Sequence, residues 1–225
     1  MKIRAIITGA TGMVGKGVLF ECLDSPDVEA VLVVSRHPLV MRHEKLKEII
    51  HKDFFDLSAI EDELKGYNAC YFCLGVSAVG LSEEKYTSLT YDLTTNFAKA
   101  VLKMNPQDMT FCYVSGAGTD SSEKGRAMWA RIKGKTENII LNMGFKDSYA
   151  FRPGFIQPQR GIRSKTWWYN AAYVIVKPLY PVLKHFPGII TTTSALGKAM
   201  INAAQHGYEK KILDSGDINK LAEMQ

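Results

Sequence analysis

A glycine-rich turn directly follows the first apolar run of the chain. The run Ile3–Thr8 is rich in β-branched residues, the segment Gly9–Gly17 has glycines at positions 9, 12 and 15, and an apolar, helix-like stretch begins at Val18. A diphosphate must approach main-chain N–H groups at the start of a helix, and glycine leaves that approach open while tolerating positive φ. Between a first strand and a first helix, this spacing predicts a dinucleotide-binding turn.

Each glycine is expected to have a separate task. Gly9 makes the turn, Gly12 allows the close approach of the phosphates, and Gly15 lets the helix pack on the strand. The alternative interpretation is a glycine-rich connection that binds no ligand. The regular alternation of the following segments favours the binding turn.

Short apolar runs alternate with amphipathic stretches along the rest of the chain. This alternation predicts an α/β fold, a doubly wound and mainly parallel Rossmann sheet with helices on both faces. The predicted strands are Ile3–Thr8, Ala30–Ser35, Ile49–Phe54, Ala69–Leu74, Thr110–Ser115, Ser148–Phe151 and Lys211–Leu213. The predicted helices are Met13–Leu23, Ser58–Leu64, Ser82–Lys103, Ser122–Met143 and Thr193–His206.

No repeat, low-complexity tract or linker divides the sequence, so we expect one domain over residues 1–225. Residues 152–190 are expected to form a small elaboration that roofs the substrate side. The Lys and Arg residues behind the net charge of +5 are scattered, so nucleic-acid binding is not expected. The first strand begins within two residues of Met1 and no uninterrupted apolar span is long enough to cross a membrane, so we expect a cytoplasmic protein.

Cysteines and histidines give no sign of a metal or redox centre. Cys70 and Cys73 lie in an apolar run whose odd separation points their side chains to opposite faces of a strand, so they are interpreted as core thiols in a reducing compartment. The five histidines have no paired helical spacing, and we predict no metal site.

The Thr8-Gly-Ala-Thr-Gly12 run and its glycine spacing resemble the extended and atypical short-chain dehydrogenase/reductase superfamily. Tyr71–Gly75, Tyr113–Gly116 and Phe151–Gly154 look like the ends of that superfamily's fourth, fifth and sixth strands, and the ending resembles its small NmrA-like and tumour-suppressor oxidoreductase-like members. The resemblance implies an NAD(P) cofactor, and members often form homodimers through long helices. Its implied cofactor contacts are Gly9, Thr11, Gly12, Met13, Val14, Gly15, Ser35, Arg36, Asp53, Phe54, Leu74, Gly75, Lys133 and Pro153.

The end of the second predicted strand decides the expected nucleotide. Folds that prefer NAD place a carboxylate about twenty positions after the glycines, whereas an arginine accommodates the 2′-phosphate of NADP. Here Ser35 and Arg36 occupy this point without a carboxylate, which favours NADP(H) over NAD(H). Arg36 as a solvated cation is the alternative. By resemblance, Asp53 and Phe54 border the adenine, although Asp53 can equally cap the following turn.

The superfamily's catalytic Tyr-x-x-x-Lys motif is altered. At the matching position the chain reads Trp129-Ala-Arg-Ile-Lys133, so an indole, which does not titrate usefully near neutral pH, replaces the phenol. Lys133 is expected to bind the nicotinamide ribose, and Ser115 is the nearest match to the serine that polarises the substrate carbonyl. The pairs Tyr173–Lys177 and Tyr180–Lys184 follow the sixth strand, in the wrong part of the fold.

Three functional hypotheses remain open at this point. The first is an NADPH-dependent oxidoreductase of a small carbonyl or related substrate, with water or an unassigned residue as proton source. The second is a non-catalytic NADP(H) sensor that acts through a protein partner, which Trp129 favours. The third is a membrane-surface dock formed by the aromatic cluster Trp167–Tyr169 with Tyr173.

Overall fold

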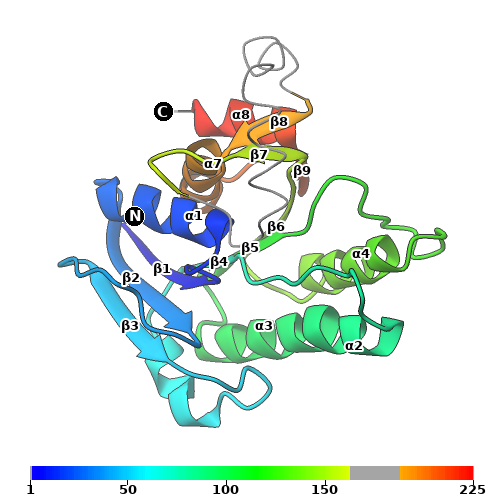
Figure 1. The fold of residues 1–225 in the computed structure, drawn as a ribbon. Coiled ribbons are helices and arrows are strands. Elements are labelled where there is room, and N and C mark those ends of the chain that lie inside the picture. The colour runs from blue at the N-terminus through cyan, green and yellow to red at the C-terminus, as the bar shows by residue number, and fades with distance from the viewer. Residues whose placement is uncertain (1, 163–187, 225) are drawn as a thin grey trace.

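The computed structural model describes residues 2–162 and 188–224. Seven strands form one sheet in the order β3-β2-β1-β4-β5-β6-β9, and every pairing within it is parallel. Helices cover both faces (Figure 1), as expected for a Rossmann sheet. The strands of this sheet are β1 (Ile3–Thr8), β2 (Val28–Ser35), β3 (Leu46–Ile50), β4 (Ala69–Phe72), β5 (Thr110–Val114), β6 (Asp147–Arg152) and β9 (Ile212–Asp214).

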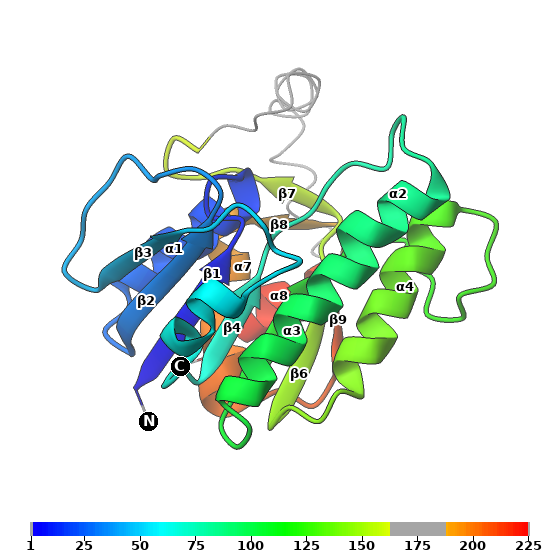
Figure 2. The same ribbon diagram turned by 90° about the horizontal axis from the view of Figure 1, so that it is seen from below.

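Two helical layers enclose the sheet. One layer holds α1 (Met13–Asp24), α7 (Thr193–His206) and α8 (Ser215–Ala222). The other holds a 3₁₀ helix (Ser58–Leu64), α2 (Glu83–Thr87), a π-helical turn (Ser88–Asp92), α3 (Leu93–Met104) and α4 (Met128–Leu141). Figure 2 shows α3 and α4 side by side across the second face.

Alternating side chains divide the core between the two faces. Ile7 and Tyr71 contribute to the core beneath α1 and α7, whereas Ile6 and Phe72 contribute to the core beneath α3. All four side chains are fully buried. A parallel sheet buried on both faces requires such continuous apolar strands.

Helices α1 and α7 come from opposite ends of the chain and pack closely. A Cβ placed on Gly17 would lie 2.5 Å from the Cβ of Thr193, and one on Gly197 would lie 3.2 Å from the Cα of Val18. Glycines on both helices therefore bring the two backbones together. The N-terminus of α1, which follows the glycine turn, is braced by the C-terminal part of the protein.

The predicted α/β sheet is confirmed, with corrections to individual elements. The third strand is Leu46–Ile50 rather than Ile49–Phe54, because Phe54 lies in a turn after the strand. Helix α4 begins at Met128 rather than Ser122, because Asp120 accepts hydrogen bonds from the main-chain N–H groups of Ser122 and Gly125 and holds a loop there.

Three elements were missing from the sequence prediction. They are β7 (Phe155–Gln157), β8 (Ile190–Thr192) and α8. The first two pair in parallel as a separate two-stranded sheet. Strands of three residues carry too few alternations to be recognised by periodicity.

Candidate nucleotide-binding site

The glycine turn connects β1 to α1 at the carboxyl edge of the sheet. Gly9 has φ +70°, and a Cβ on it would lie 2.6 Å from the carbonyl oxygen of Cys73. A Cβ on Gly15 would overlap the carbonyl oxygen of Gly9. Both positions therefore require glycine for internal reasons, one for the turn and one for helix packing.

Gly12 differs from these two glycines. Among the described residues a Cβ on it would have one neighbour, the carbonyl oxygen of Gly9 at 3.3 Å, a tight contact that a shift of a few tenths of an ångström relieves, so the fold restricts this position less than Gly9 and Gly15. Gly12 is the N-cap of α1 and has no side chain to cap the N–H groups of the first turn. A small open cradle at a helix N-terminus fits a diphosphate, which such N–H groups bind.

The end of β2 carries the residues expected to select the nucleotide. Arg36 is exposed, and no ion pair involving it is formed among the described residues. Ser35 is buried, and its hydroxyl donates to the carbonyl oxygen of His37 at 2.7 Å. Glu48 on β3 accepts a 2.7 Å hydrogen bond from the main-chain N–H of Leu39. Ser35 and Glu48 thus shape the turn that carries Arg36.

Asp53 and Phe54, which the resemblance implies border the adenine, lie in the turn that follows β3. The carboxylate of Asp53 accepts a 2.9 Å bond from the main-chain N–H of Phe55, the turn-capping alternative. Phe54 is 2% exposed, and its ring stacks on that of Phe97 with centroids 5.8 Å apart. Its side chain therefore belongs to the core.

Further expected contacts lie along the ends of β4 and β6. Leu74 is half-buried and Gly75 is exposed with open space around its Cα. Pro153 is buried, and its carbonyl oxygen accepts a 2.9 Å hydrogen bond from the main-chain N–H of Ala117. These positions share the carboxyl edge of the sheet with the glycine turn, where ligands bind in doubly wound folds.

Lys133 projects from α4 to the end of β5. Its Nζ donates a hydrogen bond to the carbonyl oxygen of Ser115. Burial lowers the pKa of this ammonium to about 8, and the negative charge of Glu137 opposes that shift. Of the atoms of residues 2–162 and 188–224, a Cβ on Gly116 would meet one within 4 Å, Lys133 Nζ at 3.9 Å, so the ammonium borders a space that none of these residues fills.

Trp129 lies one helical turn before Lys133 and is 37% exposed. Its ring packs over Gly118, where an added Cβ would come within 3.2 Å of the indole. The indole therefore has a supported position at the start of α4. An indole N–H donates a hydrogen bond but releases no proton near neutral pH.

Ser115 makes contacts that the sequence did not predict. Its hydroxyl donates to the carboxylate of Glu137, which is itself 0% exposed. Arg152 Nε donates to the two oxygens of the same carboxylate at 3.0 and 3.1 Å. Sequence reasoning missed both charged residues. The available signal was the i, i+4 spacing that places Lys133 and Glu137 on one helix face.

Two pairs named in the sequence analysis, Tyr173–Lys177 and Tyr180–Lys184, lie outside the described residues, as does the aromatic cluster at positions 167–173. The four cysteines are free thiols in or against the core, and burial raises their pKa values. Their interpretation as core thiols therefore agrees with the structure. Over residues 2–162 and 188–224 no group of acidic, cysteine or histidine side chains is arranged for a metal ion.

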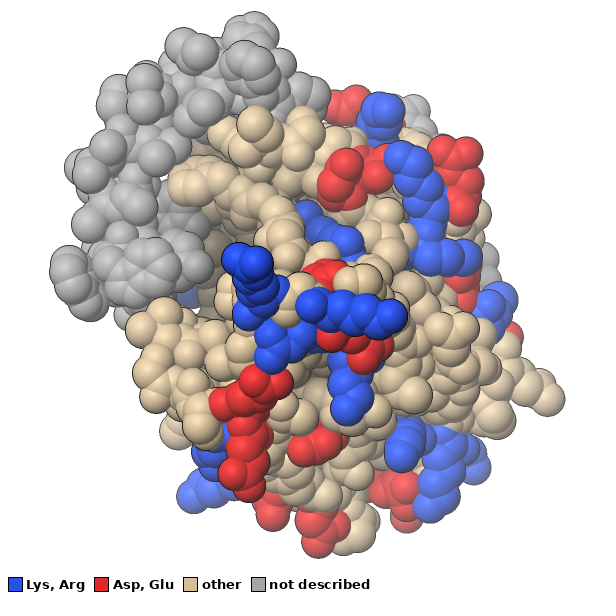
Figure 3. All heavy atoms as spheres, turned by 90° about the vertical axis from the view of Figure 1, so that its right-hand side faces the viewer, with Lys and Arg blue, Asp and Glu red and all other residues tan. Residues whose placement is uncertain are grey.

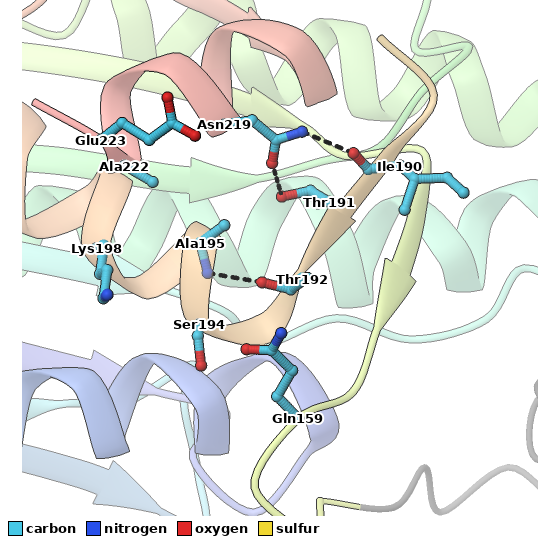
Figure 4. Close-up of a pocket in the computed structure, with 10 residues that line it drawn as sticks. All are labelled: Gln159, Ile190, Thr191, Thr192, Ser194, Ala195, Lys198, Asn219, Ala222 and Glu223. Atoms are coloured by element: carbon cyan, nitrogen blue, oxygen red, sulfur yellow. Dashed lines mark hydrogen bonds between the residues drawn. The ribbon is translucent and has the colours of Figure 1, made fainter. Parts of the chain in front are cut away.

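A separate hollow of about 390 Å³ lies between β8, α7 and α8 (Figure 4). Thr192 caps α7 by accepting a 2.9 Å bond from the N–H of Ala195. Thr191 donates to Asn219 at 2.8 Å, and the Asn219 amide donates to the carbonyl of Ile190 at 2.8 Å. Three of its polar side chains are therefore bonded within the protein, and the hollow is distinct from the glycine turn.

Comparison with known proteins identifies the family. Residues 5–124, more than half of the chain, match the family described as "NAD dependent epimerase/dehydratase family". The chain belongs to this family. Its members use a nicotinamide dinucleotide, which agrees with the cradle after β1 and with the superfamily indicated by the sequence.

Fungal proteins are among the relatives. "Protein FMP52, mitochondrial" of Debaryomyces hansenii is 28% identical over 160 residues, covering 70% of this chain and 69% of that protein. "Leucinostatins biosynthesis cluster protein T" of Purpureocillium lilacinum is 28% identical over 232 residues, covering 88% and 83%. The FMP52 relatives are named mitochondrial, so the expected cytoplasmic location is contradicted.

Solved structures share the fold at low sequence identity. DesIV, the dTDP-glucose 4,6-dehydratase of Streptomyces venezuelae solved with NAD and TYD, has a TM-score of 0.68 at 14% identity, covering 98% of this chain and 80% of that one. A short chain dehydrogenase family protein of Francisella tularensis has a TM-score of 0.66 at 14% identity, covering 96% and 99%.

Within the described part of the chain, no helix has the length and apolarity needed to cross a membrane.

Proposed function

We propose that this protein is an NADP(H)-dependent oxidoreductase that reduces a small carbonyl or related electrophile. The observation that supports this most is the turn after β1, where Gly9 and Gly15 are required by the fold and Gly12 leaves an open cradle at the N-terminus of α1. Membership of the NAD dependent epimerase/dehydratase family supports a nicotinamide dinucleotide as the cofactor. When bound, that cofactor supplies the hydride.

The residues of the carboxyl edge divide the work of binding. The N–H groups between Gly9 and Gly15 hold the diphosphate. Arg36 offers a planar fork to the 2′-phosphate and distinguishes NADP from NAD. Lys133 donates to the nicotinamide ribose from the end of β5. Ser115 contributes through its carbonyl oxygen, which positions Lys133, because its hydroxyl is bonded to Glu137.

The proton for the reduced substrate does not come from a phenol at position 129. Trp129 has no group that titrates near neutral pH, and we assign the proton to water entering beside the open space in front of Gly116. A non-catalytic NADP(H) sensor is the second candidate, and the same tryptophan favours it. The two candidates share the binding site and differ in turnover.

Nucleotide titration tests the binding proposal. NADPH is expected to quench intrinsic tryptophan fluorescence at a concentration at least tenfold lower than NADH, because a charge-assisted bond from Arg36 contributes about 1.5–3 kcal/mol. Arg36→Glu is expected to reverse that order. Arg42→Glu, an exposed arginine of the same loop, serves as the matched control and should leave it unchanged. Equal affinities for the two nucleotides in the unaltered protein would defeat the assignment.

Trp129→Tyr separates the oxidoreductase from the sensor. NADPH oxidation is measured over a panel of aldehydes and ketones for both proteins. Turnover by the wild type supports the oxidoreductase and shows that a phenol is not needed. Turnover that appears only in Trp129→Tyr would instead identify the natural protein as a nucleotide binder.

A further inference from the structure

A buried charge pair lies directly behind Lys133. Glu137 is 0% exposed and accepts hydrogen bonds from Arg152 Nε at 3.0 and 3.1 Å, as well as from Arg152 Nη2. The guanidinium side chain is 20% exposed. A carboxylate enclosed to this degree requires such partners, since an unpaired buried charge is strongly unfavourable.

The pair joins the elements that surround Lys133. Glu137 comes from α4, one turn after Lys133, whereas Arg152 ends β6. Arg152 Nη2 also donates to the hydroxyl of Ser121 at 2.5 Å, in the loop before α4. The hydroxyl of Ser115, at the end of β5, donates to Glu137. Two strand ends, a loop and a helix are thus tied to one carboxylate.

Ser115 connects this pair to Lys133. Its hydroxyl donates to Glu137, while its carbonyl oxygen accepts from Lys133 Nζ. Its main-chain N–H donates to the carbonyl oxygen of Phe151 at 2.9 Å, which fixes it against β6. The orientation of the ammonium therefore depends on a residue that Glu137 holds in place.

The negative charge of Glu137 also affects the ionisation of Lys133. Burial lowers the pKa of Lys133, and the negative charge of Glu137 opposes this. Among the described residues, Arg152 from β6 bonds to Glu137, Tyr113 from β5 lies near Glu137, and Tyr86 from α2 lies near Tyr113. Burial raises the pKa values of both phenols, so they stay neutral. Glu137 therefore supplies the one negative charge among these groups, and Arg152 offsets part of it.

We propose that Glu137 and Arg152 form a positioning pair that directs Lys133 to the carboxyl end of β5, and that within this pair Glu137 favours the charged form of Lys133 while Arg152 holds Glu137 in place. The part of this proposal that concerns the nicotinamide ribose rests on the proposed function. The ammonium borders the open space in front of Gly116. In that place a charged Lys133 donates hydrogen bonds to hydroxyl groups of a ligand, whereas a neutral amine donates fewer and weaker ones.

The titration of Lys133 tests the pair without any nucleotide. The full chain is labelled with ¹³C,¹⁵N-lysine, its Cε–Nζ correlations are followed from pH 6 to pH 10.5, and Lys133 is assigned by Lys133→Arg. We expect the wild-type midpoint near 8. Glu137→Gln is expected to lower it by about one pH unit, because an attractive charge is lost. Arg152→Gln is expected to raise it, because a repulsive charge is lost.

Opposite shifts distinguish this proposal from general structural damage, which would move both variants the same way. Either variant alone carries its own prediction if the other fails to fold. Glu83→Gln is the control. It removes the exposed ion-pair partner of Arg131, which lies on the same helix as Lys133, and it should leave the titration midpoint of Lys133 unchanged. A wild-type midpoint equal to that of exposed lysines, or unchanged midpoints in folded Glu137→Gln and Arg152→Gln, would overturn the proposal.

Nucleotide affinity then links the pair to the site. Glu137→Gln is expected to weaken NADPH binding about threefold at pH 7.5, the ratio of the charged fractions of Lys133 for midpoints near 8 and near 7, with the loss reduced at pH 6, where Lys133 is charged in both proteins. If the wild type binds no dinucleotide, the proposed function fails while the titration result stands. If affinity is unaltered although the Lys133 midpoint moves, the link of the pair to the ribose is wrong.

Discussion

The turn after β1 and the end of β5 are built in opposite ways. The turn presents main-chain N–H groups, and its glycines serve by having no side chain. The end of β5 depends on side chains that come from three distant stretches of sequence, Ser115, Lys133 with Glu137, and Arg152. The main-chain turn can be recognised from the local spacing of glycines in the sequence. The side-chain cluster at the end of β5 can be recognised only in the folded structure, where the strand ends lie together.

The two regions also differ in what a mutation disturbs. At the turn, two glycines are fixed by packing and the third faces open space, so fold and binding can be separated residue by residue. At the end of β5, the same side chains hold the structure and position Lys133. Effects of a mutation on the charge of Lys133 and on its orientation therefore have to be distinguished by titrating Lys133 itself.

The largest expected effect is loss of the fold at the turn. Gly9→Ala places a Cβ at φ +70°, 2.6 Å from the carbonyl of Cys73, and we expect a loss of about 3 kcal/mol or more in unfolding free energy. Gly15→Ala should behave similarly. Urea unfolding measures this effect. Wild-type stability in both variants would show that the turn has another conformation.

Gly12→Ala sharpens the contrast between packing and binding. Its Cβ meets one atom at 3.3 Å, so unfolding free energy should change by less than about 1 kcal/mol. NADPH affinity should fall about 100-fold, because the methyl group occupies the approach of the diphosphate. Fluorescence titration and urea unfolding are compared on the same samples. A parallel loss of both properties would contradict the separation.

Lys133→Met tests the cost of the buried ammonium. At pH 7 without nucleotide the variant should be more stable than the wild type by about 1–3 kcal/mol, because burial lowers the folded-state pKa to about 8. Between about pH 8 and 10.4 the unfolded state binds more protons, so wild-type stability rises and the difference should narrow. Lys135→Met, on an exposed position of α4, should show no such narrowing.

The smallest expected effect is at an exposed ion pair. Glu83 accepts bonds from Arg131 Nη2 at 2.9 Å, but its side chain is 59% exposed. Figure 3 shows acidic and basic side chains interspersed on one face of the molecule. Glu83→Gln should change unfolding free energy by less than about 1 kcal/mol. A much larger loss would mean that α2 and α4 depend on this pair.

The sheet and the glycine turn were predictable because their signals are local. Strand β1 and helix α7 have the predicted bounds, since each has a clear apolar period and α7 has a Thr cap beside it. The carboxylate of Glu137 was missed because nothing in a helical sequence marks a charged residue as buried. The packing of Phe54 on Phe97 was not predicted because an aromatic residue at a strand end packs equally well on a ligand or on another ring.

The close packing of α1 on α7 bears on how the chain can be shortened. The family match ends at residue 124, yet Gly17 lies against Thr193 and Gly197 lies against Val18. A fragment that ends after β5 lacks α7. The surface of α1 around Gly17 and Val18, which α7 covers in the full chain, would then be exposed to water. The helix that follows the glycine turn is therefore supported by a segment near the other end of the chain, and we expect a fragment that lacks α7 to be less stable than the full chain.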